Sequence, residues 1–286
     1  MTELERRIAA LSCWRGPVTM VPLTGGLTNL SYVVDDAGEK FVVRCGDDIP
    51  VHHVFRDRER AASVAAHAAG LSPEVIYGEP GLLVMRFIDG RTFAEADLRA
   101  NIHHLASLLR KCHREVGQHL AGPPNFFSVF HVIRDYGRTI TAADGPFAAD
   151  VPRFLEAGRV LEAAQVPMPI IFGHHDLLPG NVMDDGRRLW LIDWEYGGFG
   201  TAMFDLANLS ANGAFGEAED TMLLDAYFEG RVSAELRRSF QAMKAASALR
   251  EAMWAMVSDT HLRLPGADYK AHARDYLNRF EELMAR

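Results

Sequence analysis

The chain has 286 residues, which is enough for one large domain or for two modest lobes that each bury a core. Its 30 basic and 38 acidic residues give a formal net charge of −8, which argues against a nucleic-acid-binding surface, and no apolar run approaches the length of a membrane span. A charged N-terminus argues against a signal peptide, and the cysteines are odd in number and far apart. We therefore expect a cytoplasmic protein with three reduced thiols, Cys13, Cys45 and Cys112.

The first 88 residues predict a small lobe of five strands and one main helix. Thr2 and Glu5 form a capping-box pattern, which predicts a short helix to about residue 12. Strands are expected over 18–23, 30–34, 40–44, 75–77 and 82–88, and an alanine-rich helix over 55–69 that ends at Gly70. Asp89 and Gly90 break this pattern, so we expect the lobes to comprise residues 1–88 and 89–286.

The second lobe is predicted to be mainly helical. Apolar residues at core spacing predict one long helix over 98–120, and further helices are expected near 127–142, 150–165, 217–229, 233–258 and 268–285. Between them, residues 173–208 mix acids and amides with short apolar runs. A turn signal at 184–186 predicts a hairpin there, with Asn181 and Asp193 together at its open end.

That stretch supplies the groups that phosphoryl transfer requires. Asp176 offers a carboxylate to take a proton, and Asn181 and Asp193 offer an amide and a carboxylate beside it. Oxygen donors of this kind bind Mg²⁺, which positions and neutralises nucleotide phosphates. The pattern therefore favours a magnesium-dependent phosphotransferase.

The order of these motifs resembles the choline/ethanolamine kinases and their relatives, the aminoglycoside phosphotransferases. H-x-D-x-x-x-x-N is present at His174, Asp176 and Asn181, and it is followed by D-W-E-Y at 193–196 and D-L-A-N at 205–208. The resemblance implies an α+β, two-lobed, protein-kinase-like fold. In that fold a small antiparallel-sheet N-lobe with one helix binds the nucleotide, and a larger, mainly helical C-lobe carries the catalytic and substrate-binding residues.

The resemblance also implies roles for these residues. Asp176 would be the catalytic base, and Asn181 and Asp193 would bind the Mg²⁺ that bridges the phosphates of ATP. Glu195 would be a second metal contact that also faces the substrate. His174 would orient the catalytic loop, and Asp205 would brace its backbone.

Other positions resemble the nucleotide site of the same family. The resemblance assigns ATP contacts to a glycine-rich turn, to the end of the third strand, to the helix after it and to the end of the fifth strand: Gly25, Gly26, Thr28, Asn29, Arg44, Glu59, Phe87 and Ile88. Read by themselves, the two glycines fit an ordinary hairpin, and Arg44 fits a surface residue that closes a strand. Spacing does not single out Glu59, because arginines flank it.

The acceptor end resembles choline kinases only in part. Trp254 and Tyr269 match two members of an aromatic cage that binds the ammonium group, and Glu251 stands where the family has a first tryptophan. Helical spacing places Glu251 on the face of Trp254, where its carboxylate would favour a primary ammonium. The alternatives are that Trp254 packs in the core and that Glu251 is exposed and pairs with Arg250 or Arg263.

Together these patterns predict an ATP-dependent kinase of a small amino alcohol, with choline first and ethanolamine second. An aminoglycoside, a sugar or another small alcohol could replace that acceptor on the same fold. A non-catalytic nucleotide-binding scaffold is the alternative of another class, and the complete set of Asp176, Asn181 and Asp193 argues against it. His174, His175 and Asp176 could also suggest a metallohydrolase, but no further ligands stand at suitable spacing. The sequence leaves the oligomeric state open.

Overall fold

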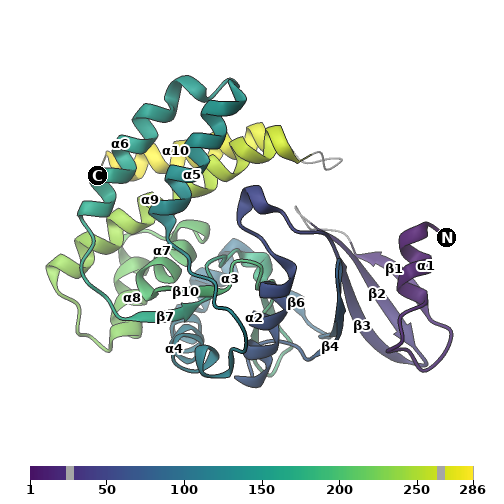
Figure 1. Cartoon of the computed structure of the whole chain (residues 1–286). Helices are drawn as coiled ribbons and strands as arrows, with labels where there is room; N and C mark the ends of the chain where they lie inside the picture. Colours follow the sequence, from purple (N-terminus) through teal and green to yellow (C-terminus); the bar gives the residue numbers. More distant parts are fainter. Residues whose placement is uncertain (24–28, 263–267, 286) are drawn as a thin grey trace.

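A five-stranded antiparallel sheet forms one end of the molecule (Figure 1). The computed structural model describes residues 1–23, 29–262 and 268–285. The strand order is β1-β2-β3-β5-β4, and helix α1 (Glu3–Ala9) packs beside the sheet. The strands are β1 (Thr19–Leu23), β2 (Leu30–Asp36), β3 (Glu39–Cys45), β4 (Val75–Glu79) and β5 (Leu82–Arg86). All five strands lie where the sequence predicts them, to within three residues.

Alternation along the strands explains this sheet. Tyr32 and Val34 of β2 and Phe41 and Val43 of β3 are buried, and they pack with Ile8 of α1 in one apolar cluster. Residues two apart point to the same face of a strand, so each strand contributes one apolar row to this core. The sheet and α1 thus have a small core of their own.

Helix α2 (Arg56–Ala68) lies between the sheet and the helical part of the chain (Figure 1). It follows a short 3₁₀ turn, η1 (Pro50–His52), and ends before Gly70, whose φ of +70° favours glycine. Its buried alanines, such as Ala62 and Ala65, belong to the large cluster of the helical lobe. The larger core therefore extends to residues before position 88, and the division into 1–88 and 89–286 stays a prediction.

Among the described residues, eight helices make up most of the chain after β5, and a two-lobed α+β fold is the result. Helix α9 is the longest of the described helices, and it is buried without a break from Met243 to Ser258, which places it at the centre of this lobe. The helices are α3 (Glu95–Ala100), α4 (Ile102–His119), α5 (Val129–Ala143), α6 (Val151–Ala163), α7 (Ala202–Asn212), α8 (Glu217–Phe228), α9 (Ala234–His261) and α10 (Tyr269–Met284).

Two details differ from the sequence prediction. The single helix expected over 98–120 is wrong, because α3 and α4 meet at Asn101, whose φ is −119°. The side-chain nitrogen of Asn101 donates to the backbone carbonyl of Asp97 at 2.9 Å, which satisfies a free carbonyl at the end of α3. Helix α7 was not predicted at all. Every one of its residues is buried, so it has no polar face to reveal a helical period.

Short strands hold the stretch between α6 and α7. β7 (Ile170–Gly173) pairs with β10 (Gly198–Thr201), and β8 (Val182–Asp184) pairs with β6 (Arg91–Thr92) and β9 (Leu189–Leu191). A second 3₁₀ turn, η2 (Ala148–Asp150), precedes α6, and η3 (Pro179–Asn181) precedes β8. The predicted hairpin is confirmed in β8 and β9.

The three cysteines are free thiols, as expected. Within the described ranges, none of the helices combines the length and the apolarity that crossing a bilayer requires.

Candidate active site

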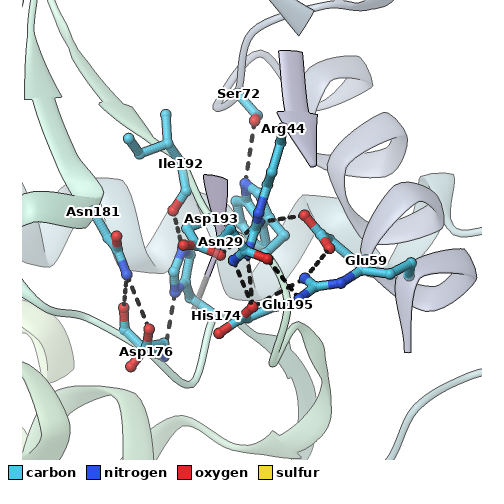
Figure 2. A network of polar contacts seen from close by, with 12 residues as sticks. Asn29, Arg44, Glu59, Ser72, His174, Asp176, Asn181, Ile192, Asp193 and Glu195 are labelled. Carbon is cyan, nitrogen blue, oxygen red and sulfur yellow. Dashed lines mark hydrogen bonds and ion pairs between the residues drawn. The ribbon is translucent and has the colours of Figure 1, made fainter. Parts of the chain in front are cut away.

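The open end of the β8–β9 hairpin brings Asn181 and Asp193 together. Val182 pairs with Leu191, and the amide of Ile192 donates to the carbonyl of Asn181 at 3.0 Å. Asn181 directly precedes β8 and Asp193 follows β9 by two residues, so both lie at the open end of the hairpin (Figure 2). This is the arrangement that the turn signal predicts.

Asp176 is held by Asn181. The side-chain nitrogen of Asn181 donates to the carboxylate of Asp176 at 3.0 Å and to its backbone carbonyl at 2.8 Å (Figure 2). Burial raises the pKa of Asp176 well above its ordinary value, while the nearby charge of Arg250 acts in the opposite direction. Because the amide nitrogen of Asn181 is committed to Asp176, its oxygen is the atom left to meet a cation.

His174 joins the catalytic loop to the end of β9. Its Nδ1 accepts the Asp176 amide at 3.3 Å, and its Nε2 donates to the carbonyl of Ile192 at 2.9 Å. Two such bonds require the neutral tautomer with the proton on Nε2. Burial lowers the pKa of His174, which keeps the ring in this form. These contacts match the orienting role that the sequence suggests.

Asp205 of α7 accepts hydrogen bonds from the backbone of the same loop. Its carboxylate accepts the amides of His174 at 2.8 Å and of His175 at 2.7 Å, and Nε2 of His113 lies 2.8 Å from it. A Cβ added to Gly173 would lie 2.9 Å from this carboxylate, so the approach requires glycine. The contact of His113 was not foreseen, since 92 residues separate it from Asp205.

Arg44 of β3 is buried among three carboxylates. It pairs with Glu59 of α2, with Asp193 at 2.8 Å and with Glu195 at 2.6 Å (Figure 2). Burial alone would lower the pKa of Arg44, but the charges of Asp193, Glu59 and Glu195 more than offset this and raise it. The Arg44–Glu59 contact that the family resemblance suggests is present.

Arg56 is a second arginine of this cluster that the sequence did not single out. It donates to Glu59 at 2.7 Å, to Glu195 at 3.1 Å and to the side-chain oxygen of Asn29 at 2.7 Å. Two further arginines follow in the next four positions, so composition gave no reason to choose it. One signal was available: Arg56 stands three residues before Glu59, which places both on one helix face. Glu195 is consequently held by two arginines.

The donors at the hairpin end suit Mg²⁺. Asp193 has a φ of +66°, uncommon for a residue other than glycine, and this backbone aims its carboxylate at the site. Its Oδ1 is in ion-pair contact with Arg44 but has no hydrogen-bond partner among the described residues. Mg²⁺ is commonly bound by one or two protein oxygens together with phosphates, which Asp193 and Asn181 can provide. The described part of the chain has no group of three or more His, Cys, Asp or Glu side chains placed to hold a metal ion.

The other predicted nucleotide contacts fall at the expected end of the sheet or outside the described residues. Phe87 and Ile88 follow β5, and the amide of Phe87 donates to the carbonyl of Lys40 at 3.2 Å. Three of the predicted nucleotide contacts lie outside the described residues: Gly25, Gly26 and Thr28. Arg263, the other possible partner of Glu251, also lies outside them.

Trp254 of α9 and Tyr269 of α10 come together at the predicted acceptor end. Their ring centres are 5.9 Å apart at an interplanar angle of 72°, an edge-to-face contact. Nε1 of Trp254 also donates to the hydroxyl of Tyr196 at 3.1 Å, and Tyr196 follows Glu195 directly. The aromatic pair is therefore linked to the catalytic stretch.

Glu251 lies beside this pair and is buried, so the alternative that it is exposed is wrong. One carboxylate oxygen accepts Nη1 of Arg250 at 2.8 Å, and the other lies 2.9 Å from Nε2 of His272. Burial raises the pKa of Glu251, but His272 and Arg250 lower it by more. The pairing with Arg250 agrees with that alternative, and whether Glu251 contacts an acceptor stays a prediction.

A five-stranded sheet beside a helical lobe, with the loop that carries His174 and Asp176 between them, defines the kinase-like phosphotransferase fold. The chain belongs to the phosphotransferase enzyme family (APH), which it matches over residues 19–243. It is 26% identical to protein LicA of Haemophilus influenzae over 208 residues, 71% of this chain and 61% of that one. It is also 26% identical to a probable ethanolamine kinase of Arabidopsis thaliana over 206 residues, which cover 65% and 54% of the two chains.

A solved structure agrees over nearly the full length. The choline/ethanolamine kinase family protein from Mesorhizobium loti superposes with a TM-score of 0.78 at 28% identity, covering 99% of this chain and 94% of that one. The two curated relatives named above are longer than this chain, which spans about 61% and 54% of their lengths.

Proposed function

We propose that the protein transfers the γ-phosphoryl group of ATP to the hydroxyl of a small amino alcohol. The observation that carries the proposal is the convergence of two groups of residues on one place. Asp176 and Asn181 form one group, and Asp193 with Arg44 forms the other. The first suits a hydroxyl that must lose a proton, and the second suits the phosphates.

In the proposed reaction the acceptor oxygen attacks the γ-phosphorus while the bond to the β,γ-bridging oxygen breaks and ADP leaves. Asp176 accepts the hydroxyl proton, and Asn181 holds its carboxylate in line with the attack. His174 and Asp205 fix the loop that carries Asp176. These residues act by orientation, which supplies much of the catalysis in phosphoryl transfer.

Asn181 and Asp193 would hold the Mg²⁺, with Glu195 as an additional ligand if it exchanges an arginine for the metal. The bound ion would neutralise charge on the β- and γ-phosphates. Arg44, kept in place by Glu59, would donate to the phosphates through its planar fork. Asn29, Phe87 and Ile88 would contact the nucleotide, as would Gly25, Gly26 and Thr28.

Trp254, Tyr269 and Glu251 are proposed to receive the cationic end of the acceptor. Aromatic faces attract an ammonium group through cation–π interaction, and a carboxylate adds charge. The likeness to a probable ethanolamine kinase and to the choline/ethanolamine kinase family protein supports an acceptor of this class. Choline and ethanolamine are both candidates.

The test is ADP release with Mg-ATP against choline, ethanolamine, an aminoglycoside and a sugar, with the phosphorylated product identified by mass spectrometry. We expect turnover of an amino alcohol by the native protein, and turnover of the same acceptor by the Asp176→Asn variant that is slower by about two to four orders of magnitude. Turnover confined to the aminoglycoside or the sugar would contradict the acceptor class. ATP binding without turnover on any acceptor would favour a scaffold.

A further inference from the structure

Arg250 of α9 is a buried guanidinium whose hydrogen-bonding capacity is mostly unused. The residue is 1% exposed, and Nη1 donates to Glu251 at 2.8 Å. Its Nε and Nη2 have no hydrogen-bond partner among the described residues. A guanidinium carries five N–H donors in a fixed plane, so one edge of the group, formed by Nε and Nη2, is free.

A free edge of this kind calls for an explanation. Buried polar groups are nearly always paired, and an unpaired charged donor carries the full cost of its desolvation. Arg44 shows the ordinary solution in the same protein, because both of its terminal nitrogens meet carboxylates. Arg250 has one carboxylate partner, Glu251, and that carboxylate is shared with His272.

The guanidinium of Arg250 lies among the groups proposed to bind the acceptor. Its Cζ lies 4.5 Å from the ring centre of Tyr196, the residue whose hydroxyl accepts from Trp254. It is also near enough to the carboxylate of Asp176 for the two charges to influence each other. The guanidinium therefore stands among the catalytic carboxylate, Glu251 and the aromatic pair proposed to bind the ammonium group.

We propose that the Nε–Nη2 edge of Arg250 binds an oxygen group of the acceptor. The preferred acceptor is then an amino alcohol that carries a second oxygen function in addition to the hydroxyl that is phosphorylated, which neither choline nor ethanolamine has, so the inference narrows the proposed acceptor class to other members. A carboxylate satisfies both nitrogens at once through the bidentate geometry that guanidinium favours, and a hydroxyl satisfies one. This inference rests on the proposed function, because it assigns a substrate class to the same site.

The first experiment uses the native protein and three acceptors that share one ammonium and one reactive hydroxyl. Ethanolamine has no second oxygen group, 2-amino-1,3-propanediol adds a hydroxyl, and serine adds a carboxylate. We expect kcat/KM for the diol or for serine to exceed that for ethanolamine by roughly 10- to 100-fold, the value of a charge-assisted hydrogen bond. A preference for serine would show that the second oxygen group of the acceptor is anionic, and a preference for the diol would show that it is neutral. Ethanolamine equal to or better than both overturns the inference.

A binding measurement separates this inference from the proposed function. Calorimetric titration of the three acceptors into the protein without nucleotide requires no turnover. Tighter binding of serine or the diol than of ethanolamine supports the role of Arg250, whether or not ADP is released. The absence of ADP release would contradict only the proposed kinase reaction. Equal affinities, or tighter binding of ethanolamine, overturn the inference.

The second experiment changes the guanidinium and keeps its charge. Arg250→Lys retains a cation near Asp176 and Glu251 but removes the planar fork. The ratio of kcat/KM for the acceptor with a second oxygen group to that for ethanolamine should therefore fall toward one, mainly through a higher KM for the former. Arg238→Lys, at an exposed position of the same helix, should keep the native preference. An equal loss for all three acceptors would show that Arg250 is only structural and would overturn the inference. The acceptor series on the native protein remains decisive if the variant does not fold.

Discussion

His52 is hydrogen-bonded to Ser258, although 206 residues separate them. Its Nε2 lies 2.9 Å from the hydroxyl of Ser258 in α9, and its Nδ1 lies 3.0 Å from the hydroxyl of Tyr136 in α5. The segment between β3 and α2 is thereby fastened to the core of the helical lobe. Because both partners are neutral hydroxyls, the contact suits a neutral imidazole.

The burial of His52 predicts a loss of stability in acid. Burial, and then the charge of Arg250, lower its pKa from 6.5 to about 3. The unfolded chain therefore binds a proton that the folded chain excludes between about pH 6.5 and pH 3, so the free energy of unfolding falls as the pH is lowered through that window. From about pH 7.5 to pH 5 this group costs about 2 kcal/mol. Urea unfolding of native protein and His52→Gln at both pH values measures it, and the variant should lose less stability in acid. The same acid loss in both would contradict the assignment.

Asp176→Asn tests the catalytic base. The amide keeps the size of the carboxylate but accepts no proton, so kcat should fall by about two to four orders of magnitude. Affinity for Mg-ATP should stay near the native value, because the proposed phosphate contacts lie on other residues. ADP release and calorimetry are the two measurements. Normal turnover by this variant would remove Asp176 from its role.

Asp193→Ala tests the metal site. Removing this carboxylate should abolish the magnesium-dependent part of ATP binding, since the ion would join the protein to the phosphates. Asp184→Ala is the matched control, because Asp184 lies on the same hairpin and its side chain accepts a hydrogen bond from the backbone amide of Gly186. Calorimetry with and without Mg²⁺ compares them. An unchanged magnesium dependence after Asp193→Ala would exclude this carboxylate as a ligand.

Arg44→Ala should weaken both the fold and ATP binding. The change leaves Glu59, Asp193 and Glu195 close together with less positive charge, and breaking a buried ion pair costs about 3–5 kcal/mol. Urea unfolding reports stability. Calorimetric titration of ATP, without denaturant and at a temperature well below Tm, reports affinity. Arg60→Ala, which removes an exposed contact to a carbonyl, is the control. Lost acceptor affinity with native ATP affinity would move Arg44 to the other end of the site.

The hairpin and its two site residues could be predicted because their information is local. A turn signal and two short apolar runs fix the register, and this register places Asn181 opposite Ile192, next to Asp193 in the chain. The five strands of the sheet could be predicted in the same way, from apolar runs and the turn residues between them, whereas the α+β kinase-like fold was implied by the family resemblance.

The missed contacts depend on distant parts of the chain. Arg56 meets Glu195 across 139 residues, and no pattern near either residue encodes that distance. The bond between His113 and Asp205 similarly depends on the packing of α4 near α7. The two free nitrogens of Arg250 are a property of a packed interior, so they could be recognised only in the folded chain.

The division of the two cores has a mechanical consequence for Arg44. Arg44 belongs to β3 and would move with the sheet. Glu59 lies on α2, whose buried alanines belong to the larger core, and Asp193 and Glu195 belong to the helical lobe as well. Hinging the sheet away would pull one cation from three anions in a single movement. With the proposed phosphate contacts of Arg44, ATP would compete with these carboxylates for the same guanidinium, so opening the molecule and binding nucleotide would both depend on the ion pairs of Arg44.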